Sequence, residues 1–75
     1  MLELSNGKCG QYYSLVGVAD SAPLKMKRRL LELGFTRGQK VRVVRKSLLK
    51  RAYLVEVRGF TLSVRRDIAQ YLLVR

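Results

Sequence analysis

The chain has no histidine and only one cysteine, Cys9, in its 75 residues. A single thiol cannot form an internal disulfide, and one chain cannot supply the three or four Cys and His ligands of a structural zinc site. Without histidine there is no general base for Ser-His-Asp or Cys-His catalysis. Because Cys9 has only Lys8 as a charged neighbour, we expect a small, partly buried or mobile thiol in a protein that is not an enzyme.

Acidic residues are also scarce, with five against sixteen Lys and Arg, and the net charge is +11. A surplus of this size favours anionic partners such as nucleic acid, acidic protein surfaces or anionic lipid headgroups. A hard-cation site needs several oxygens that converge. The five acidic residues are instead scattered: Glu3, Asp20, Glu32, Glu56 and Asp67. We therefore predict no metal site and no cofactor.

Long apolar segments are missing as well. No apolar run approaches the roughly 20 residues that span a bilayer. The first five residues, MLELS, lack the basic and apolar regions of a signal peptide. We predict a cytoplasmic protein, and a chain this short predicts a single domain over residues 1–75 with one small core.

The most informative stretch runs from residue 30 to residue 44, LLELGFTRGQKVRVV. Gly34 is expected to end a helix, because glycine accepts the left-handed dihedrals of a helix C-terminus without a steric penalty. Phe35 then falls where an apolar residue packs back on the last helical turn. Gly38 is expected in a turn that needs a positive φ. The stretch therefore predicts a helix, a tight turn and a basic strand that starts at Lys40.

The helix before this corner is predicted over Ala22 to Leu33. Asp20 or Ser21 is the expected N-cap, and Pro23 lies in the first turn, where its missing N–H costs nothing. The helical period places five apolar residues on the core side: Leu24, Met26, Leu30, Leu31 and Leu33. Arg28 and Glu32 have the spacing of an exposed ion pair.

The remaining segments alternate between apolar and polar residues, as strands do. Strands are predicted over residues 11–18, from residue 40, and over residues 53–57, 61–64 and 71–74. Val43 and Val44 break the alternation of the second strand, which indicates a bulge or burial of both faces. Gly59 supports a tight reversal with Arg58 or Phe60, and Asp67 is the expected N-cap of one helical turn through Ala69. These elements predict a small mainly-β barrel of about five strands with one α-helix between the first and second strands.

The hairpin loop after the second strand contains Leu48, Leu49, Lys50 and Arg51. Two leucines in a loop have two explanations. They tuck under the barrel, or they face a partner, because contiguous exposed apolar surface tends to mark an interaction site.

With these motifs in view, the sequence resembles the FeoA family, the small cytosolic proteins of the bacterial ferrous iron uptake system. The resemblance rests on LLELGFTRGQKV (residues 30–41), GFTLSVRRDIA (residues 59–69) and the closing LLV. It covers residues 8–75 in order. The sequence departs from the family pattern at Arg37, where proline is usual, and in the loop after Ser47, which lacks the usual glycine and proline.

The resemblance implies an SH3-like barrel in which Gly34, Gly38 and Gly59 are structural. It also implies a non-enzymatic adaptor for ferrous iron, a transition metal carried by the system, beside the membrane transporter FeoB. The expected partner is the cytosolic part of that transporter, which would hold the protein at the inner face of the membrane. The candidate contact residues are Leu48, Leu49 and Tyr53 for buried contacts and Lys50 and Arg51 for orientation.

Two alternatives stay open. A small basic barrel can bind single-stranded nucleic acid when aromatic side chains lie among cations, and the available cations are Lys40, Arg42, Arg58, Arg65 and Arg66. The main aromatic residues are instead expected in the core: Tyr12, Tyr13, Phe35, Phe60 and Tyr71. A similar barrel is the C-terminal domain of iron-dependent repressors of the diphtheria toxin repressor type. Because no helix-turn-helix segment precedes the barrel here, a free-standing adaptor is the better match.

Overall fold

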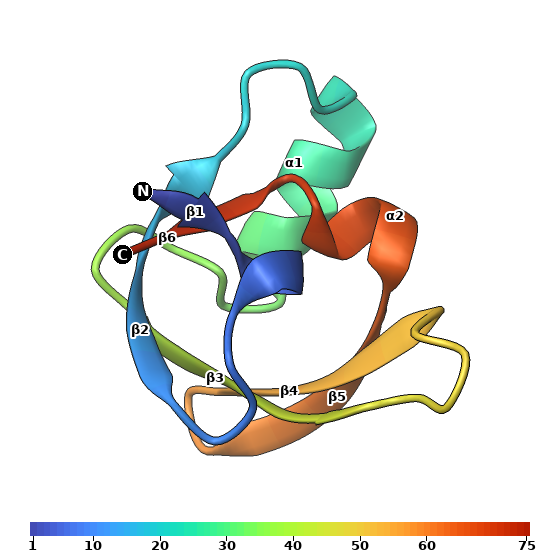
Figure 1. Ribbon diagram of the computed structural model, residues 1–75. Coiled ribbons are helices and arrows are strands. Elements are labelled where there is room, and N and C mark those ends of the chain that lie inside the picture. Colours follow the sequence, from blue (N-terminus) through green and yellow to red (C-terminus); the bar gives the residue numbers. More distant parts are fainter.

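Six antiparallel strands form the framework, in the order β1-β6-β2-β3-β4-β5. The computed structural model describes residues 1–75. The strands are β1 (Leu2–Glu3), β2 (Tyr12–Val18), β3 (Lys40–Lys46), β4 (Ala52–Val57), β5 (Phe60–Arg65) and β6 (Leu72–Val74). A 3-10 helix (Leu4–Asn6) follows β1, α1 (Leu24–Glu32) joins β2 to β3, and α2 (Arg66–Ala69) joins β5 to β6. This arrangement confirms the predicted mainly-β class, and Figure 1 shows α1 and α2 above the portion of the barrel made by β3, β4 and β5.

The two halves of β2 pair with different neighbours, which joins the two parts of the barrel. The first half of β2 pairs with β3, from Tyr12 to Ser14, and its second half pairs with β6. The register of the second pairing shifts between Leu15 and Gly17. A bulge is therefore present beside Gly17, and it lets one strand pair with both sides of the barrel.

The N-terminal segment also forms regular structure. β1 pairs with β6 through Leu2 and Val74, and the side chain of Leu4 is completely buried. The prediction of about five strands is one short, because a strand of two residues is too brief to show an alternating pattern.

The end of α1 follows the predicted pattern closely. The N–H of Gly34 donates to the carbonyl of Leu31 at 3.0 Å, and the N–H of Phe35 donates to the carbonyl of Leu30 at 3.0 Å. Gly34 has a φ of 104°, and Phe35 is fully buried. This pair of hydrogen bonds is a Schellman motif, which satisfies the last helical carbonyls and turns the chain into the core.

The start of α1 and one of its faces differ from the prediction. The helix begins at Leu24 after Pro23, which lies at the N-cap without a side-chain capping bond, so neither Asp20 nor Ser21 caps it. Leu24 and Leu31 are 63% and 51% exposed, because the barrel covers a narrower stripe of α1 than its leucines could fill. Among the ion pairs of the structure there is none between Arg28 and Glu32.

The core consists of 14 buried side chains drawn from β2 to β6, both α-helices, the 3-10 helix and Phe35. Tyr53, Val55 and Val57 all point into it from β4, which confirms the predicted alternation. In β3 the register shifts between Val43 and Arg45. Val44 lies in this bulge and is 39% exposed. Of the two explanations for Val43 and Val44, a bulge or burial of both faces, the bulge is therefore correct.

Tight turns complete the hairpins where glycine was expected. Arg58 and Gly59 have φ values of 52° and 83°, as in the type I′ turn that joins antiparallel strands. Gly38 has a φ of 87°, and the N–H of Gln39 donates to the carbonyl of Thr36. The short helix α2 begins at Arg66 with Arg65 at its N-cap, so Asp67 lies in the first turn and the predicted N-cap at Asp67 is wrong.

Candidate functional site

The loop between β3 and β4 (residues 47–51) is held in shape by Ser47. Its Oγ accepts hydrogen bonds from the backbone N–H groups of Arg51 at 3.0 Å and Ala52 at 3.2 Å. Its carbonyl accepts the N–H of Lys50 at 2.8 Å. This bond makes Leu48 and Leu49 the two central residues of a β-turn. Ser47 was not among the predicted site residues, although serine at the first position of a turn is a recognised signal.

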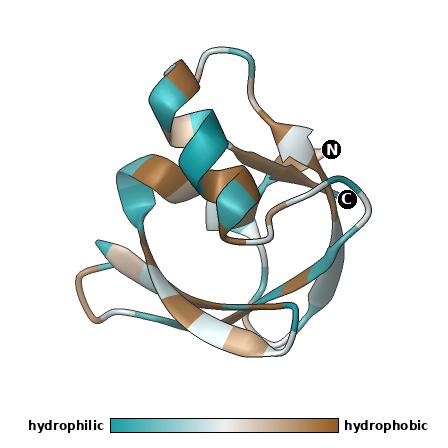
Figure 2. Ribbon diagram, turned by 180° about the vertical axis from the view of Figure 1, so that it is seen from behind, coloured by the Kyte–Doolittle hydropathy of each residue, from teal (hydrophilic) through white to brown (hydrophobic).

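The two leucines at the tip of this turn face solvent. Leu48 is 97% exposed and Leu49 is 69% exposed. Figure 2 shows the tip as a hydrophobic segment that projects from the barrel. Of the two explanations considered for these residues, burial under the barrel is therefore wrong.

Lys50 and Arg51 follow the leucines in the same loop. Both are exposed, and neither takes part in any of the ion pairs of the structure. Lys50 has a φ of 55°, a left-handed conformation that glycine usually occupies. The loop therefore presents two apolar side chains and two free cations within four consecutive residues.

Tyr53 lies apart from these four candidate residues. It is only 4% exposed and belongs to the core. Lys46 covers its ring, with Nζ 5.6 Å from the ring centroid, and the same Nζ donates to the carbonyl of Ser5 at 3.3 Å. The expectation that the Tyr53 ring is buried against a partner is therefore corrected: the ring supports β4 from inside the barrel.

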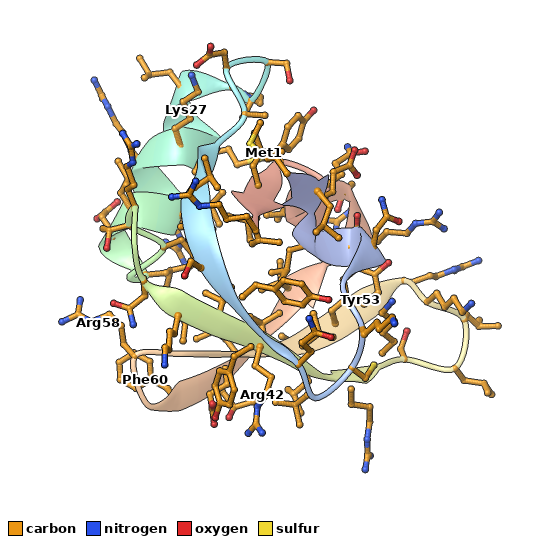
Figure 3. All side chains as sticks on the ribbon, turned by 60° about the vertical axis from the view of Figure 1, so that its left-hand side comes forward. Met1, Lys27, Arg42, Tyr53, Arg58 and Phe60 are labelled. Carbon is orange, nitrogen blue, oxygen red and sulfur yellow. The ribbon has the colours of Figure 1, made fainter.

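The outer face of β2, β3 and β4 carries a small polar cluster. The Tyr12 hydroxyl donates to a carboxylate oxygen of Glu56 at 3.0 Å, and Arg42 donates to the other oxygen at 3.1 Å. The Arg42 guanidinium also lies 4.8 Å from the centroid of the Tyr12 ring. Figure 3 shows Arg42 on the outside of the strands. Its charge is already matched by Glu56, so Arg42 is not a free cation.

The aromatic residues do not all lie where they were predicted. Tyr13 and Phe35 are buried and Tyr71 is half-buried, but Tyr12 is 52% exposed and Phe60 is 58% exposed. Tyr12 occupies an outward position of β2, and Phe60 is the first residue of β5 beside the hairpin turn (Figure 3). The prediction that both belong to the core is wrong, because alternation alone does not show how far the core extends.

An apolar groove that sequence reasoning missed lies between α1 and β5. It has a volume of about 590 Å³. Its apolar lining consists of Pro23, Met26, Leu30, Leu33, Leu62, Val64 and Ile68. Met26, Leu33 and Leu62 are half-buried because they line this groove. The groove forms where α1 packs against β5, so it cannot be seen in the sequence of either element alone.

Potential metal ligands are not gathered anywhere in the molecule. No three side chains of Cys, Asp or Glu lie close enough together to hold a metal ion. Cys9 is exposed rather than partly buried. None of the helices is long and apolar enough to cross a membrane.

Comparison with known proteins gives one consistent result. The profile of the FeoA domain family matches residues 2–75. The FeoA protein from Chlorobium tepidum has 34% sequence identity and a TM-score of 0.87, with 97% of this chain and 68% of that chain covered. No curated protein matched the chain.

Two further solved structures bear on the interpretation. FeoA from Stenotrophomonas maltophilia, solved with zinc, has 28% identity and a TM-score of 0.87, and covers 100% of this chain and 91% of its own. It is described as a prokaryotic SH3 domain protein and a candidate ferrous iron transport activating factor. A manganese-dependent transcriptional repressor has 20% identity and a TM-score of 0.86 over 97% of this chain and 35% of its own, a likeness of fold alone. The barrel is thus SH3-like, as predicted.

Proposed function

The chain belongs to the FeoA domain family, and we propose that it is a non-enzymatic accessory protein of ferrous iron uptake that binds the cytosolic part of a FeoB-type membrane transporter. The family match over nearly the whole chain supports the uptake role. The likeness to the Stenotrophomonas maltophilia protein, a candidate transport activating factor, points the same way. On this proposal the protein acts in the cytoplasm, as a single domain, and reaches the membrane through its partner.

The observation that carries the proposal is the exposed leucine pair of the β3–β4 loop. Large apolar side chains that are fully exposed lose favourable burial energy, about 25 cal/mol for each Å² left in water. Ser47 fixes the turn through three hydrogen bonds. The backbone of Leu48 and Leu49 is therefore ordered before binding, and little conformational entropy is lost when a partner binds. A preorganised apolar tip is suited to fill a pocket on another protein.

The two cations next to the leucines have a different role in this proposal. Rim charges mainly steer the approach of a partner and set the salt dependence of its association rate. Lys50 and Arg51 are exposed and unpaired, so they are free to orient an acidic surface of the transporter against the loop. Tyr53 contributes from within, because its buried ring holds the first part of β4 in place.

The test is a titration of the chain against the isolated cytosolic domain of a FeoB-type transporter. The double variant Leu48→Ala/Leu49→Ala removes the apolar tip. We expect its affinity to fall at least about tenfold, since a buried leucine contact at an interface centre contributes on the order of 1 to 2 kcal/mol. Its own fold is expected to be unchanged, because neither side chain packs on the barrel.

The matched control is Leu24→Ala/Leu31→Ala on α1. These two leucines are also exposed and lie outside the apolar groove, so the same change in composition should leave transporter binding unaffected. Equal affinities for the native chain and the loop variant would remove the β3–β4 loop from the interface. Complete absence of saturable binding by the native chain would overturn the proposed partner.

Nucleic acid binding is a second candidate because two aromatic side chains prove to be exposed. Phe60 lies beside the exposed Arg58, whereas the ring of Tyr12 is already covered by Arg42. Phe60→Ala should then weaken binding of single-stranded DNA, and the affinity should fall steeply with salt as counterions are released. Binding to the transporter that persists at physiological salt, without a DNA signal, would decide in favour of the accessory role.

A further inference from the structure

A polar cleft of about 830 Å³ lies beside the β3–β4 loop, where the 3-10 helix, α2 and the start of β4 meet. Three arginines line it: Arg51, Arg65 and Arg66. Uncharged polar side chains lie around them, from Ser5, Asn6 and Gln70. A concave surface with convergent cationic and polar groups is typical of a site for a small anionic group.

The strand register brings two of these arginines side by side. Ala52 pairs with Arg65 across β4 and β5, and the N–H of Arg66 donates to the carbonyl of Arg51 at 2.8 Å. The backbones of Arg51 and Arg66 therefore lie next to each other, one step beyond the last strand pair. Like charges on neighbouring backbone positions repel each other, and an anion between the two side chains would relieve this repulsion.

No acidic side chain forms an ion pair with Arg51 or Arg66. Two carboxylates also line the cleft: Asp67 pairs with Arg65 at 3.2 Å, and Glu3 keeps its charge while it accepts the Ser5 hydroxyl at 3.1 Å. Neither Arg51 nor Arg66 takes part in any ion pair of the structure. The cleft therefore has three arginines against two carboxylates, and two of its guanidinium groups lack an ion-pair partner.

We propose that this cleft binds a phosphate group between Arg51 and Arg66. A guanidinium donates two parallel hydrogen bonds to an oxyanion, and a phosphate has enough oxygens to accept from two guanidinium groups at once. The cleft is open and wide enough to leave room for whatever carries the phosphate. The site goes beyond the proposed transporter contact; it shares Arg51 with that contact but does not depend on it.

Two sources of phosphate fit the same chemistry. One is a soluble phosphate compound, and the other is the headgroup of an anionic phospholipid. The cleft adjoins the exposed loop through Arg51, so a lipid phosphate in the cleft would bring Leu48 and Leu49 to the membrane surface. Each basic residue near an anionic bilayer strengthens binding by about fivefold.

The soluble source is tested by titrating inorganic pyrophosphate into the full chain and following the amide and guanidinium NMR signals. We expect saturable shifts centred on Arg51 and Arg66. Arg66→Gln should weaken the binding about tenfold or more, because it removes a charge-assisted hydrogen bond. Arg66 lies outside the proposed transporter surface, so this variant should still bind the transporter domain, and failure of either proposal leaves the other intact.

The lipid source is tested by sedimentation with vesicles of phosphatidylcholine alone and of phosphatidylcholine mixed with phosphatidylglycerol. Binding to the mixed vesicles that falls about fivefold in Arg66→Gln identifies a lipid phosphate. Binding of pyrophosphate without binding of vesicles identifies a soluble phosphate. Either result supports the site.

The control is the double variant Arg28→Gln/Arg37→Gln, whose two arginines are exposed, unpaired and outside the cleft. It lowers the net charge more than Arg66→Gln does. If it weakens pyrophosphate and vesicle binding as much as Arg66→Gln does, binding depends only on the net charge of the protein, and the proposed site is overturned. The absence of saturable binding of either probe would overturn it as well.

Discussion

Lys50 and Arg58 are the two non-glycine residues with left-handed backbone conformations, with φ values of 55° and 52°. This conformation costs an L-residue roughly 1 to 2 kcal/mol, because its Cβ comes too close to the carbonyl oxygen. Both residues lie in the turns that flank β4. Each turn thus places a long basic side chain where glycine or asparagine would be less strained.

Replacing Lys50 by glycine should therefore stabilise the protein. Relief of the strained φ is partly offset by the greater freedom of glycine in the unfolded chain, so we expect a net gain of about 0.5 to 1 kcal/mol in the free energy of unfolding. Urea denaturation followed by circular dichroism measures it. The control is Lys50→Ala, which removes the same charge but keeps the Cβ. If Lys50→Ala is as stabilising as Lys50→Gly, charge and not backbone strain is the cause.

At the scale of the elements, the C-terminal end of α1 requires glycine at position 34. Gly34 combines a φ of 104° with the two hydrogen bonds of the Schellman motif. A Cβ built on Gly34 would lie 2.6 Å from Cδ of Arg58. The Arg58 side chain is flexible and can move aside, whereas the backbone strain cannot be relieved without undoing the helix end.

We expect Gly34→Ala to lower the free energy of unfolding by about 1 to 2 kcal/mol. The shift of the thermal unfolding midpoint measures the loss. In an Arg58→Ala background the steric part disappears and the backbone part remains, so most of the loss should persist there. A variant that regains full stability when Arg58 is truncated would show that the side-chain clash is the whole effect.

The same elements show which features a sequence of this kind can predict. Glycine at positions 34, 38 and 59 and the alternation in β3 and β4 depend on local dihedrals and on a period of two, so they were predicted correctly. The exposure of Leu24, Leu31, Tyr12 and Phe60 depends on what the other elements cover, and this cannot be seen within one segment. The register that puts Arg66 beside Arg51 is a long-range pairing of the same kind, so the cleft was not predicted.

At the scale of the whole molecule, charge is the dominant feature. Sixteen basic and five acidic residues give a net charge of +11, while the structure contains three ion pairs. No charged side chain is buried. Most cations therefore lie on the surface without partners and repel one another, which favours the more expanded unfolded chain.

Added salt should therefore stabilise this protein, in contrast to a protein held together by surface ion pairs. Raising NaCl from a low concentration to the physiological range shortens the screening length from about 30 Å to about 8 Å. We expect the free energy of unfolding to rise by a few tenths to about 1 kcal/mol. Arg28→Gln/Arg37→Gln, which already relieves part of the repulsion, should gain less from the same salt. A native chain whose unfolding midpoint falls as NaCl is added would contradict this account.

Phosphate should stabilise the protein beyond this general screening, because a ligand that binds only the folded state adds its own stabilisation. We expect the free energy of unfolding to rise more in phosphate buffer than in NaCl of equal ionic strength. The extra rise should be lost in Arg66→Gln, which would separate occupancy of the cleft from screening.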